Sequence, residues 1–239
     1  MRKFFIAFGL LMFASISVRA DTPVAPKNRN SSKALAAEKT VDSIVTLSAE
    51  AISALKHLPR DPPPEKLAAG MHFLVSNEMH IYYYAKASKN TGEAYLGVGT
   101  DQNFLLAGWS NPYMMVLLDF DQWVVDLHHV YAVAFHTCET AEEFRAFWSK
   151  ANRRASKDHV RKAYAGSKRL WRYVGAYNRS REKVAERLEI VIQQFTDLGM
   201  PTYLTEPTMY ARLRTLYLKN HVFMIRGDLT GARTVAALN

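Results

Sequence analysis

The stretch that most constrains the fold is the run MMVLLDF, in which apolar residues from Met114 lead into Asp119. A strand that is apolar at every position is buried on both faces, which is typical of the interior of a parallel sheet. Further apolar stretches at 94–98 and 221–226 have the length of strands. Because helical patterns separate these stretches, we expect an α/β fold with a parallel sheet and right-handed crossovers.

Apolar residues at helical spacing fill most of the remaining chain. They predict helices at about 33–55, 101–107, 124–137, 140–151, 157–176, 180–197, 206–219 and 230–238. A short strand is expected at 203–204, and the segment 73–86 fits a helix or a strand equally well. We interpret residues 33–239 as a single α/β domain with a helical N-terminal extension and a basic helical cap over about 140–197.

The first twenty residues are typical of a secretory signal peptide. Arg2 and Lys3 precede an apolar run, and small residues before the cleavage expected after Ala20 match what a signal peptidase recognises. The alternative is an uncleaved anchor, for which the apolar run is short. Residues 21–32 are polar and unpatterned, which predicts a flexible leader. We therefore expect a periplasmic or secreted protein whose mature chain has no membrane span.

The candidate ligand site is the glycine turn that follows the strand at 94–98. Parallel sheets bind ligands outside the carboxyl ends of their strands, and glycine there permits a positive φ and a close approach to the backbone. In nucleoside-binding sheets, an acid at the end of the next strand accepts hydrogen bonds from ribose hydroxyls. The alternative is a tight turn and a helix cap without a ligand. The candidate ligand-binding residues are Gly97, Gly99, Asp101, Gln102, Asn103 and Asp119.

The charge of this turn limits the ligand that it can hold. A pyrophosphate needs the N-terminus of a helix as an anion site, but Asp101 stands there and repels phosphate. The third glycine of the dinucleotide fingerprint is also missing, so NAD and FAD are disfavoured. A neutral or cationic nucleoside such as S-adenosylmethionine is compatible. Carboxylates of Glu78, Asp101, Asp119 and Asp121 could attract a divalent metal, but no ligand spacing supports one.

Four patches of the chain resemble an uncharacterised bacterial family. These patches are SNE at 76–78, YLGVGTDQNF at 95–104, MVLLDF at 115–120 and RGDLTGART at 226–234, of which DQN is the most specific. The resemblance implies a Rossmann-like fold of the S-adenosylmethionine-dependent methyltransferase type and a ligand pocket. If the chain is an enzyme, the resemblance implies a methyltransferase-like protein, and we assign no catalytic residue.

The chain departs from this family in two places. The family has basic residues and an Asn after the acid of the second strand, whereas residues 120–124 here are FDQWV, so any ligand contact of those basic groups is lost. Family members also continue beyond the GD turn through a full helix and a closing strand. The comparison therefore implies that this chain, which ends at Asn239, is truncated relative to the family.

Other reactive residues lack the context of a known site. His128, His129 and His136 lie on one predicted helix, where surface or core histidines are commoner than zinc ligands. Cys138 is the only cysteine, so no intramolecular disulfide can form, and we interpret it as a buried apolar residue. The chain has no GxSxG, P-loop or CxxC motif, so hydrolase, P-loop and thiol-redox functions have no support.

A basic segment suggests a second function. Residues 145–187 contain fourteen Lys or Arg but only three acids, and the whole chain has a formal net charge of +9. Aromatic residues interleave with these bases, a pattern that can bind an anionic polymer, although at helical spacing a solvated face over a core is more common. For an exported protein, we expect lipid head groups or an envelope polymer rather than nucleic acid. Two hypotheses remain: a small-ligand-binding protein, and a non-catalytic envelope protein that binds an anionic partner through residues 145–187.

Overall fold

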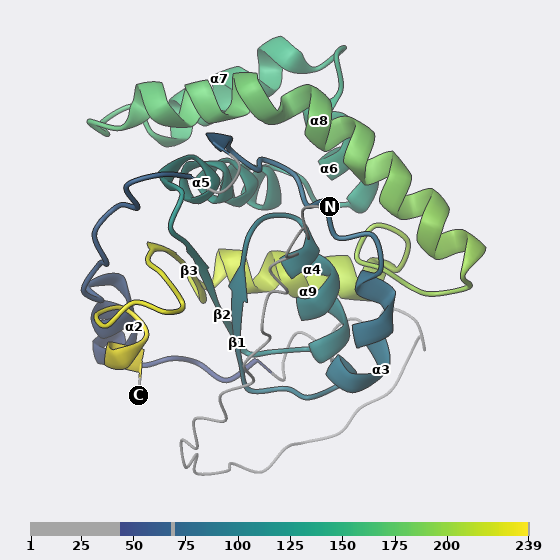
Figure 1. The fold of residues 1–239 in the computed structure, drawn as a ribbon. Coiled ribbons are helices and arrows are strands. Elements are labelled where there is room, and N and C mark those ends of the chain that lie inside the picture. The colour runs from purple at the N-terminus through teal and green to yellow at the C-terminus, as the bar shows by residue number, and fades with distance from the viewer. Residues whose placement is uncertain (1–43, 68–69, 239) are drawn as a thin grey trace, which may run out of the picture.

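The computed structural model describes residues 44–67 and 70–238 (Figure 1). The predicted signal peptide at 1–20, the leader at 21–32 and the first part of the helix expected at 33–55 lie outside these residues. The described chain is a mixed α/β structure with a three-stranded parallel sheet, as the sequence predicts. Within this part of the chain, we find no helix that is both long enough and apolar enough to span a bilayer.

The sheet follows the order β1 (Ala94–Val98), β2 (Met114–Asp119) and β3 (Val222–Arg226). All neighbours are parallel, with Gly97 opposite Leu117 and Asp119 opposite Arg226. Every residue of β2 is buried, which explains why this central strand has no polar residue before its last position. The strands predicted at 94–98, 114–120 and 221–226 are therefore confirmed.

Helices surround the sheet. Their bounds are α2 (Ala49–Lys56), α3 (Ala85–Ser88), α4 (Gln102–Ser110), α5 (Gln122–Thr137), α6 (Ala141–Trp148), α7 (Arg153–Ala163), α8 (Leu170–Asp197) and α9 (Pro207–Leu218), with 3₁₀ turns η2 (Ile81–Tyr84) and η3 (Ala236–Leu238). α7 and α8 lie across one end of the molecule, above α5 (Figure 1). They form most of the basic cap that the charge pattern predicts.

The two faces of the sheet pack against different parts of the chain. Met115 and Leu117 of β2 point into the larger core, together with residues of α4, α5, α8 and α9. Met114, Val116 and Leu118 point the other way, into a smaller cluster with apolar residues of α2 and of the C-terminal segment. The helical N-terminal extension therefore covers one face of the sheet.

Three predictions of secondary structure are wrong. α8 runs without a break from 170 to 197, because the buried residues Ala176, Ser180 and Val184 continue its core-facing side across the expected break, and the chain turns earlier, at 164–169. Residues 203–204 form a buried turn rather than a strand. The helix expected at 230–238 is reduced to η3.

A buried carboxylate explains why this last helix does not form. The backbone amides of Asp228, Arg233 and Thr234 donate to the Asp61 carboxylate at 3.1, 3.1 and 3.3 Å, so they cannot all enter a helical ladder. A Cβ at Gly231 would lie 2.4 Å from Asp61 Cγ, so only glycine fits there. These hydrogen bonds, that from Asp228 above all, hold the pKa of Asp61 below its usual value. Asp61 thus fastens the GDLTG segment to the N-terminal extension.

Candidate functional site

The carboxyl ends of β1 and β2 meet at the glycine turn, as the candidate site requires. Gly99 has φ +85°, which a residue with a side chain rarely adopts, and its amide donates to Asp119 Oδ2 at 3.2 Å. The other carboxylate oxygen, Asp119 Oδ1, accepts from the amide of Asp121 at 2.7 Å. Asp119 therefore joins the ends of the two strands.

Burial changes the acidity of the Asp119 carboxyl. Its residue is 7% exposed, and loss of hydration raises the pKa of its carboxyl to about 6, although the amides of Asp121 and Gly99 lower it in part. Its carboxyl thus exchanges a proton close to neutral pH. Such a shift at a strand end is typical of functional sites.

Gln102 covers the glycine turn. Its Nε2 donates to Val98 O at 2.7 Å, and its Oε1 accepts from the amide of Thr100 at 3.0 Å. A Cβ at Gly99 would lie 2.2 Å from this Nε2, so Gly99 also makes room for the glutamine amide. The amides of Gly99 and Thr100 are thus taken by Asp119 and Gln102, so they are not free to bind a phosphate.

Gly97 and Asn103 have structural contacts behind the turn. Asn103 is buried, accepts from Tyr95 OH at 2.8 Å, and donates to the carbonyl of Thr100 at 3.0 Å. A Cβ at Gly97 would lie 2.1 Å from Asn103 Oδ1, so this glycine admits the asparagine side chain. Neither residue lines the cavity described below.

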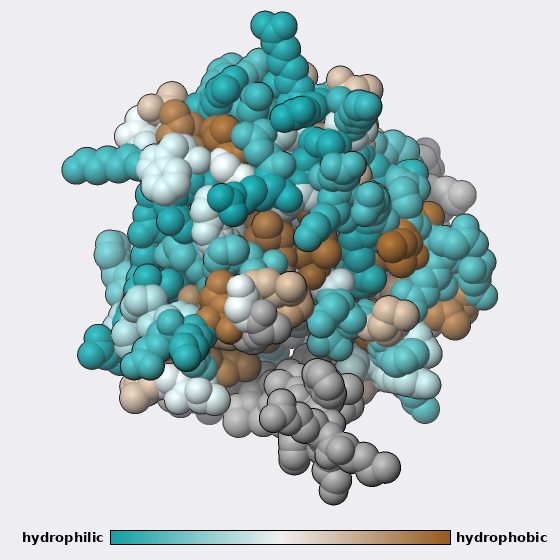
Figure 2. Space-filling model, turned by 45° about the horizontal axis from the view of Figure 1, so that its top comes forward, coloured by the Kyte–Doolittle hydropathy of each residue, from teal (hydrophilic) through white to brown (hydrophobic). Residues whose placement is uncertain are grey.

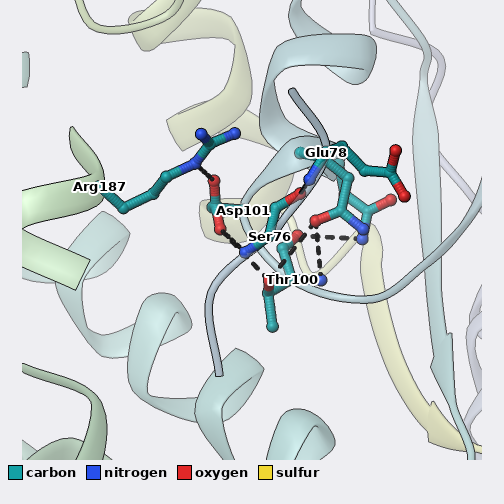
Figure 3. Close-up of polar contacts among 7 residues, drawn as sticks. Ser76, Glu78, Thr100, Asp101 and Arg187 are labelled. Atoms are coloured by element: carbon teal, nitrogen blue, oxygen red, sulfur yellow. Dashed lines mark hydrogen bonds and ion pairs between the residues drawn. The ribbon is translucent and has the colours of Figure 1, made fainter. Parts of the chain in front are cut away.

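Asp101 points away from the cavity, into a buried ion pair (Figure 3). Its Oδ2 accepts from Arg187 Nε of α8 at 2.9 Å, and its Oδ1 accepts from the amide of Ser76 at 2.7 Å. The side chains of Asp101 and Arg187 are only 2% and 8% exposed. The expectation that Asp101 repels a ligand phosphate therefore needs correction, because its charge is paired and buried.

A cavity of about 230 Å³ lies over the turn. Its floor contains Gly99, Gln102 and Asp119, and the segment 71–78 forms its other wall. Asp121 holds this segment, since its Oδ2 lies 2.7 Å from His72 Nδ1 while its Oδ1 caps α5. The remaining lining residues are Met71, Phe73, Val75, Ser76, Asn77, Glu78, Val98, Thr100, Phe120, Asp121 and Val124.

The lining of this cavity is acidic. It includes Glu78, Asp119 and Asp121 but no Lys, Arg or His. Met71 and Phe73, on the wall, are 55% and 39% exposed, so the cavity also offers apolar surface near solvent. The arrangement can therefore bind a small neutral or cationic ligand more readily than an anion.

His128 forms a hydrogen bond with the backbone of the glycine turn. It is fully buried, and its Nε2 donates to Gly99 O at 2.7 Å, which places the proton of the neutral ring on Nε2. Burial lowers the pKa of His128 to about 4 and that of His129 also to about 4. His128 therefore stays uncharged at neutral pH. The residues described here contain no group of three His, Cys, Asp or Glu that could hold a metal ion.

Sequence reasoning missed the partners of the turn. Arg187 lies 86 positions from Asp101, and no local pattern marks it as a buried counter-ion among so many exposed bases. His72 and the wall at 71–78 were equally hidden, because that segment has no regular periodicity. Only the SNE patch at 76–78 drew attention to this region.

Comparison with known protein families gives a match over most of the chain. A search of curated proteins found no match to the chain. A family model described as Domain of unknown function (DUF7790) matches residues 73–239, a range that contains the sheet, the glycine turn and α4 to α9. The chain therefore belongs to the DUF7790 family.

Proposed function

We propose that this chain is an exported protein with a Rossmann-like, methyltransferase-type fold that binds a small nucleoside-like ligand over the glycine turn. The observation that carries this proposal is the cavity at the carboxyl ends of two adjacent parallel strands, with Asp119 in its floor. Doubly wound sheets bind ligands at this edge. The raised pKa of Asp119, about 6, adds a group able to accept hydrogen bonds from hydroxyls and to exchange a proton.

The size and charge of the cavity limit which ligands can bind there. Its volume of about 230 Å³ lies below the range of roughly 300–1,000 Å³ that is usual for small-molecule sites. It therefore suits a nucleoside better than a dinucleotide. Its three acids favour a cationic group, such as the sulfonium of S-adenosylmethionine. Binding of the whole S-adenosylmethionine molecule requires the wall at 71–78 to move outward.

Methyl transfer is the reaction that the family resemblance implies. S-adenosylmethionine is made in the cytoplasm, so an exported protein has no evident supply of it. We therefore propose ligand binding as the function and assign no catalytic base. Edman sequencing of the secreted chain tests export directly, with Asp21 expected as the first residue.

Ligand-induced stabilisation tests the binding proposal. Adenosine, S-adenosylmethionine and S-adenosylhomocysteine are each added to the mature chain, and the unfolding temperature is measured. A ligand at 100 times its dissociation constant stabilises the fold by about 2.7 kcal/mol. We expect stabilisation by at least one of them and less by adenosine monophosphate, because the lining has three acids and no basic residue to pair with its phosphate.

Two variants test whether the ligand binds in this cavity. Asp119→Asn and the exposed Glu78→Gln are expected to reduce the ligand-induced shift, measured relative to each variant without ligand. Asp158→Asn, an exposed acid on α7 outside the cavity lining, is the matched control and should leave the shift unchanged. If no nucleoside at millimolar concentration stabilises the wild-type chain, the proposal is wrong.

A second candidate function rests on the basic cap. Trp171 of α8 is 64% exposed, and the Arg172 guanidinium lies 5.5 Å from its ring centroid. The side of the molecule that carries α7 and α8 is mainly hydrophilic (Figure 2). Its exposed bases are Lys150, Arg153, Arg154, Arg161, Lys162, Lys168, Arg179 and Lys183. An exposed tryptophan among bases suits the interface of an anionic membrane, which we propose as the alternative partner.

Vesicle binding tests this alternative. Vesicles of phosphatidylglycerol should bind the mature chain and vesicles of phosphatidylcholine should not, and salt should weaken binding steeply. The double substitution Arg153→Glu/Arg154→Glu should abolish binding, and Trp171→Ala should weaken it. Lys56→Glu/Lys219→Glu makes the same charge change at exposed sites on α2 and beside α9 and is the control. Binding that ignores salt or the Arg substitutions would exclude this function.

A further inference from the structure

A second, larger cavity lies at the opposite edge of the sheet from the glycine turn. It has a volume of about 510 Å³, and Asn111 and Pro112, which precede β2, form part of its wall. Residues of α3, α4 and α9 and the Met200–Pro201 segment complete it. Its volume falls within the range of roughly 300–1,000 Å³ that is usual for sites that bind small molecules. It shares no residue with the cavity over the glycine turn.

The inner walls of this cavity are apolar. Trp109 of α4 and Leu213 and Leu216 of α9 are buried residues that line it. Trp109 Nε1 donates to Pro201 O at 2.8 Å, so the indole is fixed and its polar atom is satisfied. The remaining apolar lining comes from Ala85, Ala107, Gly108, Pro112, Met200 and Met209. These walls favour an apolar ligand body over a sugar or a peptide backbone.

Gly108 helps to keep the cavity open. A Cβ at this position would lie 2.9 Å from Met209 Cε, at the end of a flexible side chain. Because Gly108 has no side chain, the Met209 side chain of α9 can pack directly against α4 at this position. A large side chain at position 108 would enter the space between these two helices.

The charged residues of the lining are all basic. Lys86 and Lys89 are exposed, three positions apart at the end of α3, and neither has an acidic neighbour in the lining. Arg212 is buried in the wall, where its Nη2 donates to the carbonyls of Asn111 and Pro112 at 3.0 and 3.1 Å. The two exposed lysines, with no acid in the lining, make the mouth of the cavity attractive to an anion, unlike the acidic cavity at the glycine turn.

We propose that this cavity binds an amphipathic carboxylate, with its apolar chain between α4 and α9 and its carboxylate at Lys86 and Lys89. A medium-chain fatty acid has this chemistry. Removal of each methylene from water contributes enough free energy to tighten binding by a factor of about 4. Affinity should therefore rise along the series hexanoate, octanoate and decanoate. This proposal is independent of nucleoside binding and of the membrane alternative.

Titration calorimetry with the mature chain tests the proposal, with each ligand below its micelle concentration. Decanoate is expected to bind and to release heat that saturates at one site. Decyltrimethylammonium, which carries the same chain on a cation, should bind at least tenfold more weakly because the mouth is basic. No binding of decanoate, equal binding of the cation, or affinity independent of chain length would overturn the proposal.

Variants separate this cavity from non-specific binding. Lys86→Glu/Lys89→Glu changes only exposed side chains and should weaken decanoate binding at least tenfold. Gly108→Leu should block the cavity, while circular dichroism checks that the fold is kept. Lys56→Glu/Lys219→Glu makes the same charge change away from the cavity and should leave affinity unchanged. Decanoate binding that Lys86→Glu/Lys89→Glu does not weaken would place the ligand elsewhere and refute the assignment.

Discussion

The buried ion pair between Arg187 and Asp101 leads to a quantitative prediction of stability. Its Nε–Oδ2 distance is 2.9 Å, and its side chains are 8% and 2% exposed. Two unit charges about 4 Å apart attract by about 4 kcal/mol at an effective dielectric constant of about 20. Much of this attraction offsets the free energy lost when both groups leave water. The net contribution of the pair to the free energy of unfolding is therefore smaller than the cost of removing one partner alone.

Replacement of Arg187 by Met leaves the Asp101 carboxylate buried without its counter-ion. Its bonds to the Ser76 amide and the Thr100 hydroxyl remain, but no charge compensates it. Removal of one partner of a buried pair costs about 3–5 kcal/mol. We expect Arg187→Met to lower the free energy of unfolding by this amount.

Urea unfolding followed by tryptophan fluorescence measures this loss. With a slope of about 2 kcal/mol per molar urea, the midpoint should fall by about 2 M. The control is Arg145→Met, because Arg145 pairs with Glu189 at 2.8 Å but the side chains are 38% and 59% exposed. Exposed pairs contribute about 0.2–1 kcal/mol, so this midpoint should move by less than about 0.5 M.

A double substitution checks that the charge, rather than packing, causes the loss. Asp101→Asn combined with Arg187→Met removes both charges. We expect it to cost less than the sum of the single substitutions by about 1–3 kcal/mol. If Arg187→Met costs no more than Arg145→Met, or if the two losses simply add, the reasoning about the buried pair is refuted.

Two further predictions concern Asp119 and Asp61. Burial raises the pKa of Asp119 from 3.8 to about 6, so ionisation of its carboxyl destabilises the folded state. This loss of stability is absent well below pH 3.8 and grows as the pH rises to about 6. Between pH 4 and 7, the unfolding free energy of wild type relative to Asp119→Asn should fall by about 2 kcal/mol, and a parallel pH dependence of the two proteins would contradict this. Asp61→Ala removes the acceptor of three amides, so trypsin should cleave after Arg226 and Arg233 faster than in wild type, with Asp158→Ala as an exposed control. Equal cleavage rates would show that Asp61 does not hold this segment.

The sheet could be predicted because its information is local. β2 is apolar up to Asp119 at its end, and Gly97 and Gly99 mark the end of β1, so both strands can be identified from short stretches. The ends of α8 could not be predicted in this way. Separate helices are expected at 157–176 and 180–197, but Tyr177 and Ser180 are buried in one continuous helix whose start is set by the turn at 164–169.

Only part of the candidate site could be predicted. The approach of Gly99 to Asp119 follows from two neighbouring parallel strands that end at the same edge. The place of Gln102 does not follow, since its position in the sequence is equally consistent with a side chain that faces a ligand. Its amide bonds to Val98 and Thr100 and so covers the turn, while the side chain also lines the floor of the cavity.

The sequence by itself determined the three strands of the sheet and the place of the glycine turn at their ends, because hydrophobic pattern and glycine positions act over a few residues. The tertiary structure alone decided which charges remain available at that edge. Arg187 and Asp101 are 86 positions apart, and His72 reaches Asp121 across 49. Whether a carboxylate faces a ligand or a buried counter-ion depends on contacts between distant segments, and these form only when the whole core packs.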